Sequence, residues 1–320
     1  MEILDSSIEL FRVLFLLGAI ISLLYKKKYG ITPGGIVVPG ILAGILFASF
    51  RSFVVLLVTT TICWMIHRVF ISKYALSSRW TTLICMSISA TLGLLTMYIF
   101  RKYISFSSES SLVSLVVPGL ITISAKKYGI GKIAYSTLFV TAVTGSVGVL
   151  LASLIPHQQL TSLNVQLAEY TPLTLTAPFV VIPVSLITAI LIYYRFGIRG
   201  GGYVIGPFLA LLMFIAPLQA LSIAVAIAIS YWSMKFIQQY TLIIGLERFV
   251  ASLFMGYFTI TAIDYIAITA GVGQYYPSPQ IAIIAVAVIT NELCLQPARL
   301  SILKGVLPSL LIAYLTRLAV

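Results

Sequence analysis

Two Pro-Gly steps inside apolar segments are the residues of this sequence best suited to chemistry. Pro39-Gly40 lies within IVVPGIL, and Pro118-Gly119 lies within LVVPGLI. Proline lacks a backbone N–H and its ring clashes with the preceding helical turn, so each step predicts a kinked or interrupted helix. A helix that begins inside a membrane presents unpaired N–H groups and the positive end of its dipole, which favour anions. The steps therefore indicate binding of anionic groups, with a simple packing kink as the alternative.

Asn291 and Glu292 are the most informative polar residues within an apolar segment. An ionisable group at membrane depth is costly unless it has a partner or a water-filled pocket. Arg299 or Lys304 could be that partner, so a structural ion pair and a functional role both stay open. Arg248 follows Glu247 at the start of the preceding apolar segment, where we expect it at the membrane interface.

Basic residues beside the apolar segments form the third candidate group. They could dock an acidic partner protein or guide an anionic polymer by charge, whereas their alternative role is to set topology alone. These residues are Lys26, Lys27, Lys28, Lys126, Lys127, Arg195 and Arg199.

Known catalytic motifs are absent from the sequence. It contains no G-x-x-x-x-G-K-(S/T) loop, no H-E-x-x-H, no G-x-S-x-G and no carboxylate cluster fit to hold magnesium. His67 and His157 have no His, Cys or carboxylate at ligand spacing, so neither is expected to bind a metal. We therefore predict no catalytic residue, no cofactor and no metal.

The composition indicates which solvent surrounds these residues. Of 320 residues, 60% are hydrophobic and only 9% are charged, a balance that a soluble domain of this size cannot tolerate at its surface. The net charge of +12 comes from basic residues scattered between apolar segments rather than gathered in a patch, so nucleic acid is not an expected partner. The first apolar segment follows acidic residues instead of a basic n-region, so we expect it to remain as a membrane span.

The apolar segments predict an all-α, polytopic integral membrane protein with about twelve transmembrane or re-entrant helices. With this threading, fifteen of the 20 basic residues fall on one side, which places that side in the cytoplasm and both termini outside. The shorter spans are expected to tilt, re-enter or pack among neighbours. The expected spans are residues 8–25, 35–50, 52–70, 80–100, 111–125, 133–155, 173–195, 202–217, 218–237, 247–268, 280–295 and 301–319.

An internal repeat divides the sequence into two halves. GITPGGIVVPGILA aligns without gaps with GIRGGGYVIGPFLA at an offset of 167, and Trp64 matches Trp232 at an offset of 168. We therefore predict two tandem six-span repeats with broken helices, residues 1–160 and 165–320, related by an axis along the membrane normal. Beside the two Pro-Gly steps, the predicted conduit or broken-helix positions are Pro33, Gly34, Gly35, Gly201, Gly202, Gly206, Pro207, Asn291 and Glu292.

A smaller, mirrored repeat lies inside the first half. One KKYGI precedes IVVPGIL, and a second KKYGI follows LVVPGLI. Both KKYGI loops are expected in the cytoplasm, which places the two Pro-Gly steps on spans of opposite direction. Interrupted helices in matching positions are typical of the central site of a transporter.

These motifs resemble those of the PgsC/CapC family, the small membrane subunit of poly-gamma-glutamate capsule synthesis. The resemblance rests on GITPGGIVVPGILA and LVVPGLITISAKKYG and covers roughly residues 1–155. The second half resembles the family weakly, because Gly206-Pro207 and Val286-Ala287 replace the two Pro-Gly steps, whereas Asn291 stands where the family has an asparagine. The chain is thus similar to a duplicated member whose halves have specialised.

The resemblance implies a non-catalytic subunit of the bacterial cytoplasmic membrane. Its implied partners are the lipid bilayer, a separate ATP-dependent, Mur-ligase-like synthase, other capsule-synthesis membrane proteins and the anionic polymer that it passes outward. The tandem halves and broken helices leave a second possibility, a secondary transporter for a small organic anion. A scaffold without a conduit is the third.

Overall fold

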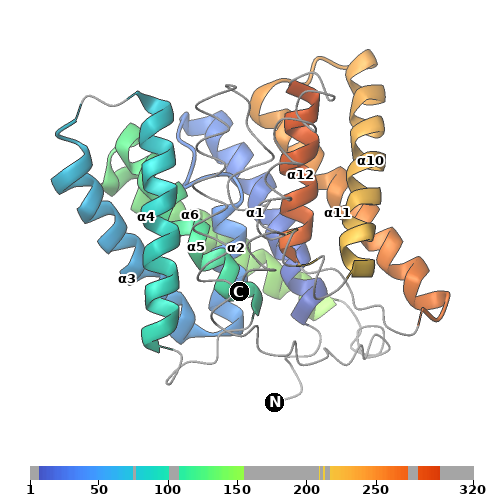
Figure 1. Ribbon diagram of the computed structural model, residues 1–320, viewed down its shortest axis with the longest axis horizontal. Coiled ribbons are helices and arrows are strands. Elements are labelled where there is room, and N and C mark those ends of the chain that lie inside the picture. The colour runs from blue at the N-terminus through green and yellow to red at the C-terminus, as the bar shows by residue number, and fades with distance from the viewer. Residues whose placement is uncertain are drawn as a thin grey trace, which may run out of the picture. The chain divides into compact units, whose positions relative to one another are not determined.

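The computed structural model describes residues 7–74, 77–100, 108–154, 209, 212, 217–272 and 280–295. Within these ranges the regular structure is helical, with no strand. The chain divides into two compact units, Met1–Asn164 and Val165–Val320. Figure 1 colours the helices of the first unit blue to green and those of the second yellow to red.

The first unit contains long helices and one conspicuously short one. The short helix α2 packs against α1 and α6, while α3, α4 and α5 pack against one another. The bounds are α1 Ser7–Tyr29, α2 Val38–Ala48, α3 Phe50–Ile66, the π-helical turn η1 His67–Ile71, α4 Ser78–Phe100, α5 Ser108–Tyr128 and α6 Ile130–Leu154.

The two KKYG sequences end α1 and α5 in the same way. Gly30 and Gly129 have left-handed φ angles of 70° and 87°, which glycine adopts without a steric penalty. Their N–H groups donate to the carbonyls of Lys26 at 2.8 Å and Ala125 at 2.9 Å. The mirrored repeat of the sequence is therefore a repeated helix stop in the structure.

The described helices of the second unit form one mutually packed group. They are α10 Pro217–Tyr240, α11 Gly245–Thr269 and α12 Gln280–Leu295. Gly256 on α11 allows the closest approach, because a Cβ there would lie 3.3 Å from the carbonyl oxygen of Ile283 on α12. The trio α10, α11, α12 thus follows the same chain order as the packed trio α3, α4, α5 of the first unit.

Exposed apolar side chains on α3 recur on α10 at an offset of 167. Side chains of this kind suit lipid rather than water, and their spacing of three or four residues places them on one helix face. The exposed residues are Val54, Val58, Ile62 and Met65 on α3 with Val69 on the following η1, and Leu221, Val225, Ile229, Trp232 and Phe236 on α10. The structural counterpart of Trp232 is therefore Met65, one residue away from the Trp64 that the sequence comparison matched to it.

The other two helix pairs give matching registers. Tyr98 and Ile99 at the exposed end of α4 correspond to Tyr265 and Ile266 of α11, again at an offset of 167. The buried residues Val117, Ile121, Thr122 and Ala125 of α5 correspond to Ala285, Ile289, Thr290 and Leu293 of α12 at an offset of 168. These registers identify equivalent positions in the two trios.

Four helices in the described ranges are long and apolar enough to cross a membrane. They are Phe50–Ile71, Ile130–Leu151, Pro217–Tyr240 and Gly245–Thr269. Shorter apolar helices occupy Val38–Phe47, Trp80–Thr96 and Ala282–Leu295. The all-helical class is confirmed, whereas the count of about twelve spans in two six-span repeats stays a prediction.

Candidate functional site

The first Pro-Gly step starts a helix instead of bending one. Residues 30–37 form a loop after α1, and Gly34 and Gly35 in this loop have positive φ angles of 63° and 126°. Helix α2 then begins at Val38 with Pro39 in its first turn, where the missing proline N–H costs no helical hydrogen bond. The N-cap residue Val37 makes no side-chain capping bond, so no side chain caps the positive end of α2.

The buried hydroxyl group of Thr137 on α6 faces this loop. A Cβ on Gly34 would lie 3.0 Å from Thr137 Oγ1 and 3.1 Å from Ile121 Cγ1, so the loop packs directly on α6 and α5. Thr137 and Thr141 are each 4% exposed, and within the described ranges their hydroxyl oxygens have no hydrogen-bond partner. The glycine loop, the uncapped start of α2 and Thr137 together form a polar site inside an apolar unit, and Thr141 lies one helical turn further along α6.

Gly40 allows α2 to lie against α1 at backbone contact distance. A Cβ on Gly40 would be 2.8 Å from the Leu14 carbonyl oxygen and from Phe15 Cα, and a Cβ on Gly18 would be 2.3 Å from Gly40 Cα. The glycine of the step therefore fixes the position of the loop by close packing.

The second Pro-Gly step does not interrupt its helix. Helix α5 continues from Ser108 to Tyr128 through Pro118. The next amide, Gly119 N–H, donates to Ser89 Oγ of α4 at 2.9 Å, so a neighbouring helix supplies an acceptor at the turn that proline weakens. The expected half-helix after Pro118-Gly119 is therefore absent, and the step serves α4–α5 packing.

The lysines in and beside the two KKYG motifs differ in their exposure and in their hydrogen bonds. Lys126 Nζ donates to Thr81 Oγ1 of α4 at 2.8 Å, which commits it to a cross-helix bond. Lys127 is exposed and lies 4.9 Å from the Tyr128 ring centroid, just as the exposed Lys28 lies 5.4 Å from that of Tyr29. Lys26 is half-buried and Lys27 is exposed.

The structure brings the two KKYG motifs together through Tyr128. Partial burial alone would raise the pKa of its hydroxyl, but hydrogen bonds with Lys127 and Thr32 and the charge of Lys26 outweigh it, so the pKa lies below its ordinary value. Thr32 belongs to the loop before α2. Positive charge from Lys127 and from Lys26, the residue before the first KKYG motif, therefore lies beside that loop.

We expect Tyr128→Phe to destabilise the protein chiefly at alkaline pH. Because the pKa is lowered in the fold, ionisation of Tyr128 stabilises the protein as pH rises from the folded pKa to the unfolded one, and this contribution is lost as pH falls through the folded pKa. Thermal unfolding in nanodiscs at neutral pH and above about pH 10 tests it, with the exposed Tyr74→Phe as control. An equal loss at both pH values would contradict this account.

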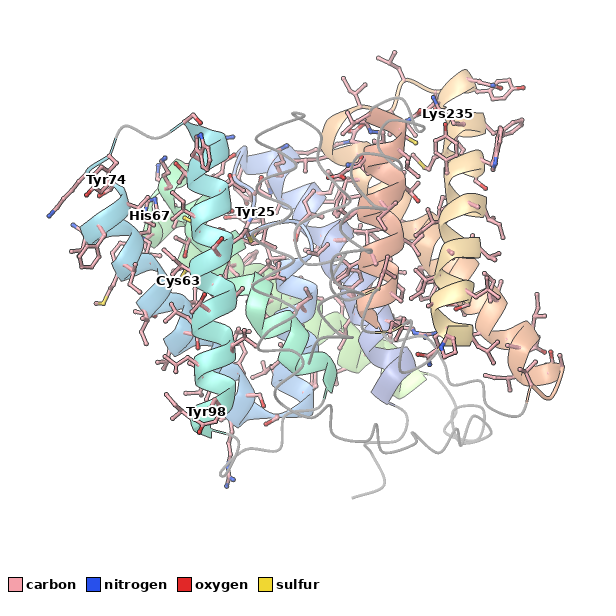
Figure 2. All side chains as sticks on the ribbon, in the orientation of Figure 1. Tyr25, Cys63, His67, Tyr74, Tyr98 and Lys235 are labelled. Carbon is pink, nitrogen blue, oxygen red and sulfur yellow. The ribbon has the colours of Figure 1, made fainter. Side chains whose placement is uncertain are left out.

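His67 is a buried polar residue whose environment the sequence did not reveal. It is 5% exposed, it opens the π-helical turn, and its Nε2 has no hydrogen-bond partner in the described part of the chain. Figure 2 shows it at the start of η1, one turn beyond Cys63 of α3. The charge of Lys126 acts on both His67 and Cys85, so these three residues lie near one another where η1, α4 and α5 meet.

In the second unit the structure joins Asn291 to a residue that we had expected at the interface. Arg248 Nε of α11 donates to Asn291 Oδ1 of α12 at 2.9 Å. Glu292 is 8% exposed and has an interaction of its own. Its suggested partners Arg299 and Lys304 lie outside the described residues, as do these candidate positions: Arg195, Arg199, Gly201, Gly202, Gly206 and Pro207.

Comparisons with known proteins point in one direction. The family described as Capsule biosynthesis CapC matches the chain twice, over residues 17–134 and again over residues 184–301. The PGA biosynthesis protein CapC of Bacillus subtilis (strain 168) is 26% identical over 133 residues, which cover 41% of this chain and 89% of that protein. No solved structure matches the chain.

Proposed function

Because the chain belongs to the capsule biosynthesis CapC family, we propose that it is a non-catalytic membrane subunit of poly-gamma-glutamate synthesis. It anchors a separate ATP-dependent ligase on the cytoplasmic side and passes the anionic polymer outward across the bacterial cytoplasmic membrane. The topology that accompanies this proposal is a chain of about twelve spans in two tandem repeats, with both termini outside.

The observation that carries the conduit part of the proposal is the site at the start of α2. Its first turn has no side-chain cap, and the hydroxyl of Thr137 packs against the glycine loop without a partner among the described residues. Backbone N–H groups at a helix start and hydroxyl groups donate hydrogen bonds to carboxylates. Lys127 and Lys26 supply positive charge beside it, which attracts a polyanion.

Reversing the charge of Lys127 tests the docking part of the proposal. Lys127 is exposed, whereas Lys126 holds Thr81, so only Lys127 can be reversed without breaking a bond between helices. The tagged chain is recovered from native membranes in mild detergent, and the eluate is assayed for ATP-dependent glutamate polymerisation. We expect Lys127→Glu to lower the recovered activity about tenfold, because the glutamate repels an acidic ligase surface.

Lys132→Glu is the matched control for this experiment. Lys132 is also exposed and lies a few residues further on, at the start of α6, so it makes the same change of charge outside the motif. Equal losses from both variants would show that only net charge matters. Recovery of the wild-type chain without any ligase would contradict the proposal.

Secondary transport of a small organic anion is the second candidate function. The repeated family match and the short helix α2 after a broken segment favour it, because paired repeats with discontinuous helices surround the binding sites of transporters. Uptake of labelled glutamate by vesicles that contain only this chain distinguishes the two. A transporter works alone, whereas the proposed subunit does not.

A further inference from the structure

The contact between Arg248 and Asn291 lies at one end of a closely packed, antiparallel helix pair. Gly256 of α11 lies beside Ile283 and Val286 of α12. Two helical turns earlier on α11, Arg248 reaches Asn291, which is more than one turn later on α12. These two contacts fix the register of the pair from Gly256 to Arg248.

Two buried hydroxyl groups lie between these contacts. Ser252 is one turn from both Arg248 and Gly256 on α11, and Thr290 is one turn beyond Val286 on α12. Both are 0% exposed, and their hydroxyl oxygens have no hydrogen-bond partner in the described ranges. A buried hydroxyl without a partner is costly, so two of them about one turn apart in the same helix pair indicate a polar ligand between the helices.

The guanidinium of Arg248 is oriented by one hydrogen bond and has further N–H donors available. Within the described residues its one hydrogen bond goes from Nε to Asn291, which leaves the two Nη groups to bind a ligand. Glu247 and Glu292 lie next to this pair in the sequence, but each has an interaction of its own. Arg248 is half-buried, which strengthens its attraction for an anion.

The first unit has a different arrangement at the same positions. The registers of the two trios place Thr81 at the position of Arg248 and Ile123 at the position of Asn291. Cys85 and Thr122 correspond to Ser252 and Thr290, and Thr122 donates to the Pro118 carbonyl at 2.8 Å. The guanidinium, the amide that orients it and the paired free hydroxyls occur together only in the second unit among the described residues.

We propose that Arg248, Asn291, Ser252 and Thr290 form a carboxylate-binding site in the second unit. The planar guanidinium binds a carboxylate through its Nη groups, Asn291 orients it through Nε, and the two hydroxyls donate to the same ligand from the interior. That the carboxylate belongs to glutamate or to a gamma-linked glutamyl chain rests on the proposed function. The binding site itself does not depend on ligase docking.

The test is binding of two defined probes to the purified full chain in nanodiscs. The probes are free glutamate and synthetic gamma-linked tetraglutamate, and a tetramer with carboxamides in place of the side carboxylates measures binding that does not require charge. We expect Arg248→Gln to weaken tetraglutamate binding about tenfold or more, and Ser252→Ala and Thr290→Val to weaken it about threefold each. Arg248→Lys keeps the charge but cannot bind a carboxylate through two parallel hydrogen bonds, so it should also weaken tetraglutamate binding about tenfold.

Arg68→Gln is the matched control, because Arg68 is an exposed arginine that lies over the Trp64 ring of the first unit. It should leave the affinity unchanged. Each variant is first shown to be monodisperse with a cooperative melting transition, and Ser252→Ala, which removes a single oxygen atom, keeps the test valid if an arginine variant does not fold. Wild-type affinity in both Arg248→Gln and Ser252→Ala, or an equal loss in Arg68→Gln, would overturn the site.

The two probes separate the site from the function. If Arg248→Gln weakens binding of free glutamate and of tetraglutamate equally, the site binds a carboxylate from either molecule. If it weakens binding of tetraglutamate more strongly, the ligand of the site is the polymer. Unchanged binding in both Arg248→Gln and Ser252→Ala, together with recovered ligase activity, would reject the site while the proposed function stands.

Discussion

Alanine at Gly40 is expected to push α1 and α2 apart and to destabilise the first unit strongly. The added Cβ would lie 2.8 Å from the Leu14 carbonyl oxygen and from Phe15 Cα, which are backbone atoms that cannot rotate away. Overpacking of this kind costs about 3 kcal/mol. Total stabilities of about 5–15 kcal/mol make that a large fraction.

The melting temperature of the purified chain in nanodiscs measures this effect. Gly131→Ala is the control, because Gly131 lies in the first turn of α6 with no atom within 4 Å of an added Cβ. Alanine favours a helix over glycine by about 1 kcal/mol, so Gly131→Ala should be neutral or stabilising. A Gly40→Ala variant that melts with the wild type would show that α1 and α2 do not pack as described.

Alanine at Gly34 is expected to deform the loop before α2 and to reduce polymer delivery. Gly34 has a φ of 63°, and an added Cβ would lie 3.0 Å from Thr137 Oγ1, 3.1 Å from Ile121 and 3.3 Å from Val38. The left-handed backbone costs about 1–2 kcal/mol for alanine, and crowding adds about 1–3 kcal/mol. The loop must therefore move away from α6, which separates Thr137 from the start of α2.

Gly30 offers a control with the same backbone and no crowding. Its φ is 70°, and nothing lies within 4 Å of an added Cβ. Gly30→Ala should show the backbone cost alone, so the difference between the two variants isolates packing on Thr137. The measurements are the free energy of unfolding and the polymer delivered outside the cell, and equal effects of the two substitutions would refute the role given to Thr137.

Features that depend on local chemistry were readable from the sequence. KKYG ends a helix at both occurrences because glycine at the left-handed position satisfies the last carbonyls within a few residues. Pro39 marks the start of α2 for a reason equally local, since its fixed φ suits a first turn. Of the predicted broken-helix positions, Pro33, Gly34 and Gly35 therefore lie in the loop before α2, whereas Pro118 and Gly119 lie inside α5.

Features that depend on a distant partner were not readable. Pro118 was expected to kink or interrupt α5, yet Ser89, 30 residues earlier, accepts from the next amide and the helix continues. Arg248 was expected at the interface because it opens an apolar segment, and nothing near it in the sequence indicates that it bonds to Asn291, 43 residues away. Thr137 and His67 likewise gain their significance only from the elements packed around them.

The lysine at the end of α5 limits how the two units can exchange parts. In the first unit Lys126 on α5 donates to Thr81 on α4. In the second unit Arg248 on α11 stands at the position of Thr81, and Cys294 on α12 stands at the position of Lys126. The charges of Lys235 and Arg248 both act on Cys294. A chimaera with α5 in place of α12 would set Lys126 against Arg248 and Lys235, whereas the reverse exchange would place Cys294 opposite Thr81 and remove the bond that Lys126 makes. We therefore expect a functional exchange between the units only when α4 and α5 replace α11 and α12 together, or the reverse.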